Sequence, residues 1–111
     1  MEPNELTIAD AIKKLNNKEI SSLDLTKACL ARIKKVNKKL NACLTVCEKE
    51  ALKEAKEADE KIKKGGKGAL LGIPYLCKDN IMTRGIRTTA SSKILENNTA
   101  PYDATVIKKL K

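Results

Sequence analysis

The sequence contains no histidine, phenylalanine or tryptophan, and its only aromatic residues are two tyrosines. Within these 111 residues, the absence of histidine excludes zinc binding through imidazole and catalysis by a histidine base. The four cysteines form no CxxC pair, so no metal site is predicted. The core has to be aliphatic, which favours helices.

Long apolar runs are also missing. No segment approaches the ~20 apolar residues that a membrane-spanning helix needs. The first ten residues, MEPNELTIAD, are acidic and polar, unlike a secretion signal. We therefore expect a cytoplasmic chain with free thiols and no membrane contact. At 111 residues, it makes one domain at most, with a modest core.

Acidic residues are fewer than basic ones, 14 against 23, for a formal net charge of +9. The excess is concentrated in residues 27–39, KACLARIKKVNKK, which contain six basic residues and no acid. This segment permits attraction to nucleic acid or another polyanion. We favour a solvated helix face, because aromatic residues for base stacking are missing. A non-catalytic helical module that binds tRNA or a protein partner through this segment stays open as the alternative.

Two segments near the N-terminus carry helix start signals. Thr7 and Ser21 are each followed three residues later by an aspartate, the spacing of a capping pair. We predict a short helix that ends near Asn16 and a longer helix that runs to about Leu40. Their predicted core faces are Ile8, Ala11, Ile12 and Leu15 in the first, and Leu25, Cys29, Ile33, Val36 and Leu40 in the second.

The middle of the chain is predicted to be a strand followed by a third helix. Residues 41–47, NACLTVC, break the helical period and suit a strand, whereas residues 48–64 restore it as a solvent-facing helix with balanced charge. The two glycines that follow suit a left-handed helix end. A phosphate-binding loop is disfavoured, because Lys67 precedes Gly68 instead of serine or threonine and no helix start comes next.

Residues 73–77 are apolar and suit a buried strand that ends at Lys78. Catalytic groups in α/β sheets commonly lie beyond the carboxyl ends of strands. Enclosure of an ammonium disfavours its charged form, so an enclosed lysine can act as a neutral base. A lysine paired with Asp79 in an exposed turn is the simpler explanation, and the residue pattern alone favours it. Cys77 is predicted to face the opposite way, into the core.

The C-terminal part has no regular period. Residues 81–102 contain hydroxyl and turn residues and are predicted to form a structured loop. Asp103 is expected to cap a last helix with an apolar face of Val106, Ile107 and Leu110. Because this helix extends only about two turns, we expect a truncated chain.

Residues 70–110 resemble the start of the amidase signature family. SKILEN followed by PYDATV, with ELTIADAIKKL and LNACLTV upstream, is similar to the A subunits of tRNA-dependent amidotransferases, so the resemblance covers nearly the whole chain. The family's Gly-Ile-Pro, Lys-Asp-Asn, Gly, Thr-Thr, Ser and Asp-Ala series is matched by Gly72 to Pro74, Lys78 to Asn80, Gly85, Thr88, Thr89, Ser92, and Asp103 with Ala104.

The resemblance implies an α/β fold, with residues 1–111 as the N-terminal fragment of one amidase-signature domain, an α/β/α sandwich with a mixed sheet. In this fragment, which is helix-rich, residues 1–64 would be mainly helical. Residues 65–111 would supply a strand, a loop and the start of a helix around the catalytic lysine. The C-terminal remainder would be absent.

The family hydrolyses amides with a Ser, cis-Ser and Lys triad, so Lys78 is implied to deprotonate the nucleophile through the bridging serine. Both catalytic serines belong to a Gly- and Ser-rich segment downstream, and Ser91 and Ser92 are not those serines. The chain alone is therefore expected to be inactive. Support for the lysine is implied from the adjacent loop residues, with no metal: Asp79, Asn80, Thr88, Thr89 and Ser92.

The A subunits hydrolyse glutamine and pass the ammonia to a partner subunit. That partner activates misacylated tRNA with ATP and Mg, so no cofactor is expected on this chain. The implied partners are the B and C subunits of a heterotrimeric amidotransferase. Another amide hydrolase of the same family stays open as an alternative.

Overall fold

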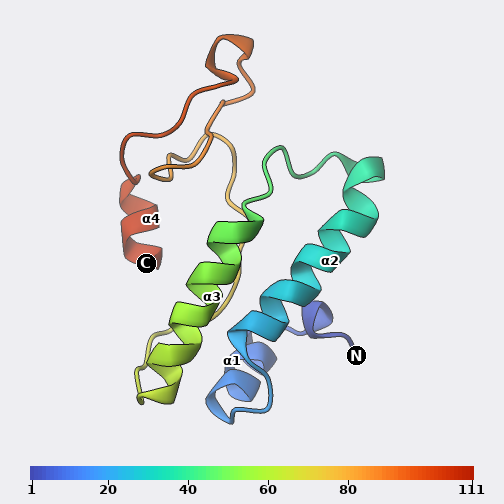
Figure 1. The fold of residues 1–111 in the computed structure, drawn as a ribbon, viewed down its shortest axis with the longest axis vertical. Coiled ribbons are helices and arrows are strands. Elements are labelled where there is room, and N and C mark those ends of the chain that lie inside the picture. The colour runs from blue at the N-terminus through green and yellow to red at the C-terminus, as the bar shows by residue number, and fades with distance from the viewer. The chain divides into compact units, whose positions relative to one another are not determined.

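The computed structural model describes all 111 residues and consists of helices joined by loops (Figure 1). The chain divides into two compact units, Met1–Tyr75 and Leu76–Lys111. The first unit contains the 3₁₀ turn η1 (Pro3–Glu5) and the helices α1 (Ile8–Asn16), α2 (Ser22–Leu40) and α3 (Glu48–Lys63); the second contains the 3₁₀ turn η2 (Lys93–Leu95) and the helix α4 (Thr105–Leu110).

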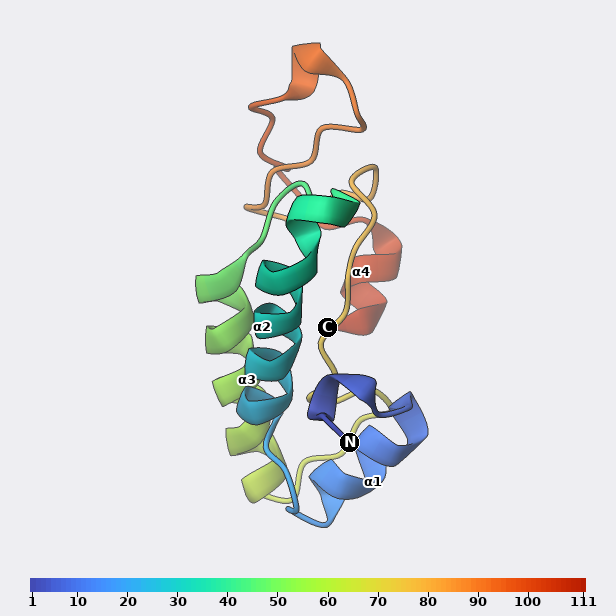
Figure 2. The ribbon, with the colours of Figure 1, turned by 90° about the vertical axis from the view of Figure 1, so that its right-hand side faces the viewer.

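In the first unit, α2 and α3 lie side by side and run in opposite directions (Figures 1 and 2). Helix α1 lies at the end of this pair where α2 begins (Figure 2). Both predicted caps are confirmed: the Thr7 hydroxyl accepts a hydrogen bond from the Asp10 amide at 3.1 Å, and Ser21 and Asp24 form a capping box. Local sequence therefore decides where α1 and α2 begin.

The core of this unit is a small aliphatic cluster between the helices. Two predicted core residues, Ile8 and Leu40, are 57% and 67% exposed, because they sit at helix ends beyond the reach of a packing partner. Cys29 packs against the cluster as predicted, and burial raises the pKa of its thiol. The buried residues of the cluster are Ala11, Leu15 and Leu25, with Leu6, Ile20, Cys29, Ile62 and Ile73 packed against them.

Asp59 of α3 ties that helix to the start of α2. Its two carboxylate oxygens accept hydrogen bonds from the amides of Ser22, at 2.6 Å, and Leu23, at 3.1 Å. The first amides of a helix have no partner within it, and the helix dipole favours an anion there. The Ser22 hydroxyl in turn donates to the carbonyl of Gly72 at 2.7 Å. One helix start thus connects to two distant segments.

Gly72 is required by both its conformation and its surroundings. Its φ of +86° lies in the left-handed region, which other residues adopt at a cost. A β-carbon there would lie 3.3 Å from side-chain atoms of Ile62, Leu15 and Ser22. The glycine lets the chain pass close over the core before Ile73 packs against it.

The glycines after α3 end that helix. Gly65 has a φ of +82°, and the amides of Gly65 and Gly66 donate to the carbonyls of Ile62 and Lys61 at 3.1 and 2.7 Å. This is the Schellman arrangement. The predicted left-handed helix end is confirmed, and the glycine-rich segment serves as a connection.

Neither predicted strand forms, so the structure confirms the helix-rich character but shows no sheet. Residues 41–47 are a loop, held where the Asn37 side chain both donates to and accepts from the backbone of Cys43 at 2.9 Å. Residues 73–77 are an irregular segment in which Leu76 is 73% exposed, so the expectation of a fully buried strand is wrong. A strand needs a neighbouring backbone for its amides and carbonyls, and these segments have none here.

The second unit contains a long structured loop, as predicted for residues 81–102. Hydrogen bonds join the two ends of this loop. Backbone hydrogen bonds join Gly85 and Ile86 to Ala100, and an isolated bridge pairs Arg87 with Thr99. Asp103 does not cap α4, contrary to prediction; its carboxylate accepts from the Arg84 amide at 2.7 Å instead. Of the predicted apolar face of α4, only Ile107 is buried.

We predict that Asp59→Ala lowers the free energy of unfolding by about 1–2 kcal/mol, because the amides of Ser22 and Leu23 lose their acceptor. Urea unfolding followed by circular dichroism measures the change. Glu57→Ala on the exposed side of α3 is the matched control and should change stability by less than about 0.5 kcal/mol. Equal effects of the two substitutions would show that the cap contributes nothing.

Candidate functional site

Lys78, the predicted catalytic base, lies at the start of a turn. Its carbonyl accepts a hydrogen bond from the Ile81 amide at 3.0 Å, and its side chain is exposed. The amine is therefore not enclosed within these 111 residues, because no sheet forms around it. Asp79 does not pair with Lys78 either, so the exposed turn is present without the ion pair.

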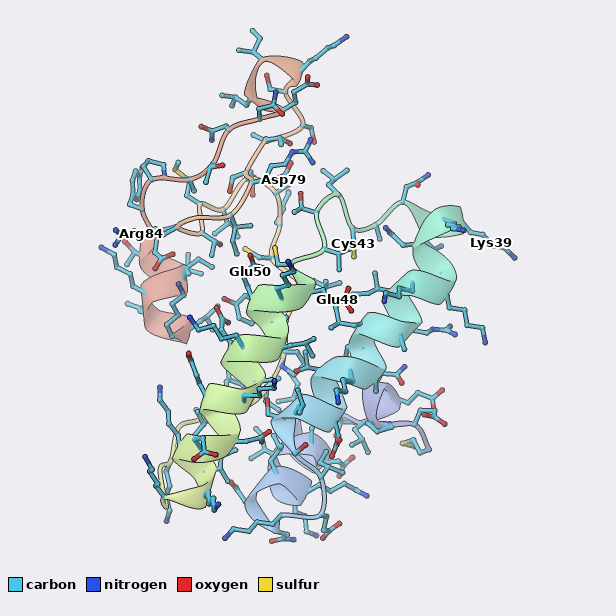
Figure 3. All side chains as sticks on the ribbon, viewed as in Figure 1. Lys39, Cys43, Glu48, Glu50, Asp79 and Arg84 are labelled. Atoms are coloured by element: carbon cyan, nitrogen blue, oxygen red, sulfur yellow. The ribbon has the colours of Figure 1, made fainter.

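Asp79 instead pairs with Thr89 (Figure 3 labels Asp79). One carboxylate oxygen accepts from the Thr89 amide at 2.9 Å, and the other accepts from the Thr89 hydroxyl. These hydrogen bonds, above all the one from the hydroxyl, lower the pKa of Asp79, and the Ser91 amide and the positive charge of Arg87 act in the same direction. Thr89 is buried, whereas Asp79 is half-buried, so the contact lies at the edge of the folded loop.

The backbone beyond Thr89 is held in an uncommon conformation. Ala90 and Ser91 have φ angles of +48° and +59°, which cost on the order of 1 kcal/mol each for residues other than glycine. Two hydrogen bonds hold them: the Ala90 amide donates to the Asp79 carbonyl at 3.0 Å, and the Ser91 amide donates to the Thr89 hydroxyl at 3.2 Å. We call residues 79 and 89–91, with these contacts, the aspartate clasp.

The other predicted site residues have different positions relative to the clasp. Ser92 reaches it through its backbone, since its amide donates to the Thr89 carbonyl at 2.9 Å. Thr88 is buried and anchors the returning chain, with hydrogen bonds between its backbone and Asn98 at 2.9 and 3.0 Å. Asn80 is exposed and takes no part in this network.

Cys77, predicted to be a core residue, is exposed. Its sulfur lies 3.9 Å from the Thr83 hydroxyl and 3.7 Å from the Lys78 carbonyl. The prediction assumed a strand whose alternate side chains face opposite sides of a sheet, and without that sheet no layer covers Cys77.

Asp103 is a further residue whose partners the sequence did not reveal. It accepts from the Arg84 amide and, at 3.1 Å, from the Lys111 ammonium, and the Arg84 hydrogen bond is the main cause of its lowered pKa. Figure 3 labels Arg84 at the base of the loop. The position of Asp103 before an apolar helical segment suggested a cap, and nothing in the local pattern pointed to a partner 19 residues away.

No three histidine, cysteine, aspartate or glutamate side chains lie close enough together to hold a metal ion. None of the helices has the length and apolar character that crossing a membrane requires. The candidate site in these residues therefore consists of the Lys78 amine and, beside it, the hydrogen-bonded loop that contains the aspartate clasp.

Known proteins share much of this sequence. The family model described as Amidase matches residues 24–111. The chain is 54% identical over 110 residues to the A subunit of the glutamyl-tRNA(Gln) amidotransferase of Thermoanaerobacter pseudethanolicus, covering 99% of this chain and 22% of that protein. It is 54% identical over 98 residues to the A subunit of the same name from Francisella tularensis subsp. novicida, covering 88% of this chain and 20% of that one.

A solved structure of a vestigial protein complex, described as revealing the evolutionary origins of an s-triazine catabolic enzyme, matches with a TM-score of 0.88. The match has 25% sequence identity and covers 95% of this chain and 23% of that one. The inhibitor-bound form of the same complex matches equally well. The chain thus spans about a fifth of the length of the curated relatives it matches.

The clasp predicts a measurable pH dependence. Because the folded pKa of Asp79 is lowered, its contribution to stability is complete above the ordinary aspartate value of about 3.9 and is lost as pH falls through the lowered value. Thr89→Val removes the hydroxyl donor and keeps the amide and the shape. We expect it to raise the pKa of Asp79 back toward the ordinary value, as measured by NMR titration of the carboxyl carbon.

Thr99→Val, at an exposed threonine in the same loop, is the matched control for this titration. It should leave the pKa of Asp79 unchanged. An unaltered pKa in Thr89→Val would mean that the hydroxyl contact does not hold the carboxylate in its charged form.

Proposed function

This chain belongs to the amidase family, and on that premise we propose that it is the N-terminal part of the A subunit of a tRNA-dependent amidotransferase, which hydrolyses glutamine. The observation that carries the proposal is the 54% identity to the Thermoanaerobacter protein over 99% of this chain. The identity extends through the upstream helices as well as the motif region, so it supports membership of this particular branch of the family.

In this proposal, Lys78 is the general base. A lysine with a neutral amine accepts the proton of the nucleophilic serine through a bridging serine when the three groups lie within hydrogen-bond reach. Both serines and the oxyanion-hole amides come from the polypeptide that follows residue 111. The 111-residue chain is then inactive by itself, because loss of the nucleophile and of the oxyanion donors removes nearly all chemistry.

The aspartate clasp supports Lys78 through the backbone. Asp79 is the next residue, and its side chain and carbonyl are both fixed to the loop at 89–91. This fixes the direction in which the chain leaves Lys78. Thr88 and Ser92 anchor the two sides of that loop, while Asn80 is left exposed for contacts with the remainder of the protein.

Exposed apolar side chains support a larger folded body. Leu44 and Val46 are 58% and 43% exposed, and Leu76 is 73% exposed, all in the segments predicted to be strands. In an α/β/α sandwich these segments would pair with strands of the remainder, which would cover them and enclose Lys78. The missing sheet and the exposed Lys78 amine would then have the same cause, which is that the strands of the remainder are not part of these 111 residues.

The proposed complex assigns the other steps to partners. Ammonia released from glutamine passes to a partner subunit that activates misacylated tRNA with ATP and Mg, and B and C subunits complete the heterotrimer, in the cytoplasm. The likeness to the s-triazine-related complex at 25% identity favours a second candidate, another amide hydrolase of the family. Substrate choice between them depends on residues outside this chain.

The test joins residues 1–111 to the remaining part of the Thermoanaerobacter protein, in place of its own matching segment. We expect the joined protein, assembled with its partner subunits, to release ammonia from glutamine, and the isolated chain to release none. Lys78→Ala should lower the rate by about 1,000-fold or more, because the base is lost.

Lys67→Ala, at an exposed lysine of the glycine-rich connection, is the matched control and should leave the rate unchanged. Turnover that survives Lys78→Ala would disprove the role of Lys78. A different result would be that the isolated chain turns over glutamine and loses this activity in Lys78→Ala. That result would disprove the proposal that the base lies on this chain and the catalytic serines on the remainder. Hydrolysis of other amides but not of glutamine would favour the second candidate.

A further inference from the structure

We propose that the exposed face of α2 is a docking surface for the phosphate backbone of RNA. This face, called the basic face, is defined by Lys27, Arg32, Lys34, Lys35, Lys38 and Lys39, all of them exposed. The proposal concerns a surface of the first unit and does not depend on amide hydrolysis.

The helical period gathers the six cations on the part of α2 that its buried residues leave free. Lys27, Lys34 and Lys38 are seven and four residues apart, so they form one line, and the other three lie to one side of it. The face extends over ~18 Å from Lys27 to Lys39 at the usual helical rise. The buried residue Leu25 lies opposite the line, and Lys39 lies at the last turn, away from α3 (Figure 3).

The charge of this face is almost uncompensated. Only Lys34 has an acidic partner, Glu48 at 3.3 Å; the other five cations make no ion pair. Lys34 with Lys38 and Lys35 with Lys39 are like-charge pairs four residues apart, which repel each other. Residues 48–64 show the contrast, because acids and bases are interleaved along a helix of similar length. A polyanion would relieve the repulsion on α2.

Two structural explanations account for only part of the pattern. Lysines in the last turn favour the negative end of the helix dipole, which explains Lys38 and Lys39. That effect fades within one turn, so it does not explain Lys27 or Arg32. A general excess of lysine does not explain why acids are interleaved on α3 and absent from residues 27–39 of α2.

The side chains also indicate the class of partner. A helix that lies on a membrane inserts large apolar residues, and between the cations this face exposes only Ala31. Stacking on bases needs aromatic side chains, which α2 lacks. Among the ways of binding a nucleic acid, contacts with phosphates remain, as in sequence-independent binding. We therefore expect recognition of the RNA backbone with little dependence on base sequence.

The test measures binding of the 111-residue chain to fluorescently labelled tRNA by anisotropy over a salt series. With about four phosphate contacts, the affinity should fall roughly 100-fold between about 50 and 200 mM salt. A variant with Lys27, Lys35, Lys38 and Lys39 changed to glutamine should bind at least about 10-fold more weakly at about 100 mM salt and show a flatter salt dependence.

The matched control changes Lys49, Lys53, Lys56 and Lys63 of α3 to glutamine, which removes the same charge from exposed positions of another helix. It should retain the affinity of the unaltered chain. Circular dichroism checks that both variants keep their helices. Retained binding in the control supports the proposal, and equal weakening of both variants overturns it, because net charge alone would then attract the RNA.

Competition identifies the partner class. Polyglutamate or vesicles containing phosphatidylserine that bind as tightly as tRNA, at equal charge, would overturn the assignment to RNA. Absence of tRNA binding by the unaltered chain would do the same. Binding that vanishes in the joined protein would show that the remainder covers the basic face, which also contradicts the proposal.

Discussion

The carboxylate of Asp59 is the contact on which the arrangement of the first unit depends. It accepts the free amides at the start of α2 from the neighbouring helix, and the adjacent Ser22 hydroxyl reaches the carbonyl of Gly72. Three segments far apart in the chain therefore meet at one helix start. The aliphatic cluster of Ala11, Leu15 and Leu25 is small, so the polar contacts at its edge contribute much to fixing how the helices pack.

In the second unit, aspartates hold the irregular part of the chain in the same way. Asp79 accepts from the amide and hydroxyl of Thr89, and Asp103 accepts from the amide of Arg84. An irregular chain has no ladder to satisfy its backbone amides, and a carboxylate is a strong acceptor for them. The lowered pKa values of the two aspartates express the same preference for the charged form. These aspartates replace part of the order that strands would provide.

Family membership and the missing sheet fit together. The chain covers about a fifth of its relatives, and it presents Lys78 in a shaped but open loop. In the proposed enzyme this fifth contributes the base and the loop that orients it, and the remainder contributes the nucleophile and the enclosure. The remainder would then do two things at once in the proposed enzyme. It would cover the exposed apolar segments, which stabilises the fold, and it would remove Lys78 from water, which favours the neutral amine.

Local sequence was enough to specify the helices, their caps at Thr7 and Ser21, the glycine end of α3 and the family, because these depend on contacts or motifs within a few residues. It also directed attention to Lys78 and its neighbour. It failed for residues 41–47 and 73–77, since a strand exists only beside another backbone. The long-range partners became visible only in the folded chain: Asp79 with Thr89, Asp59 with the start of α2, and Asp103 with Arg84. Those partners are 10 to 37 residues apart, and side-chain chemistry alone does not select among distant donors.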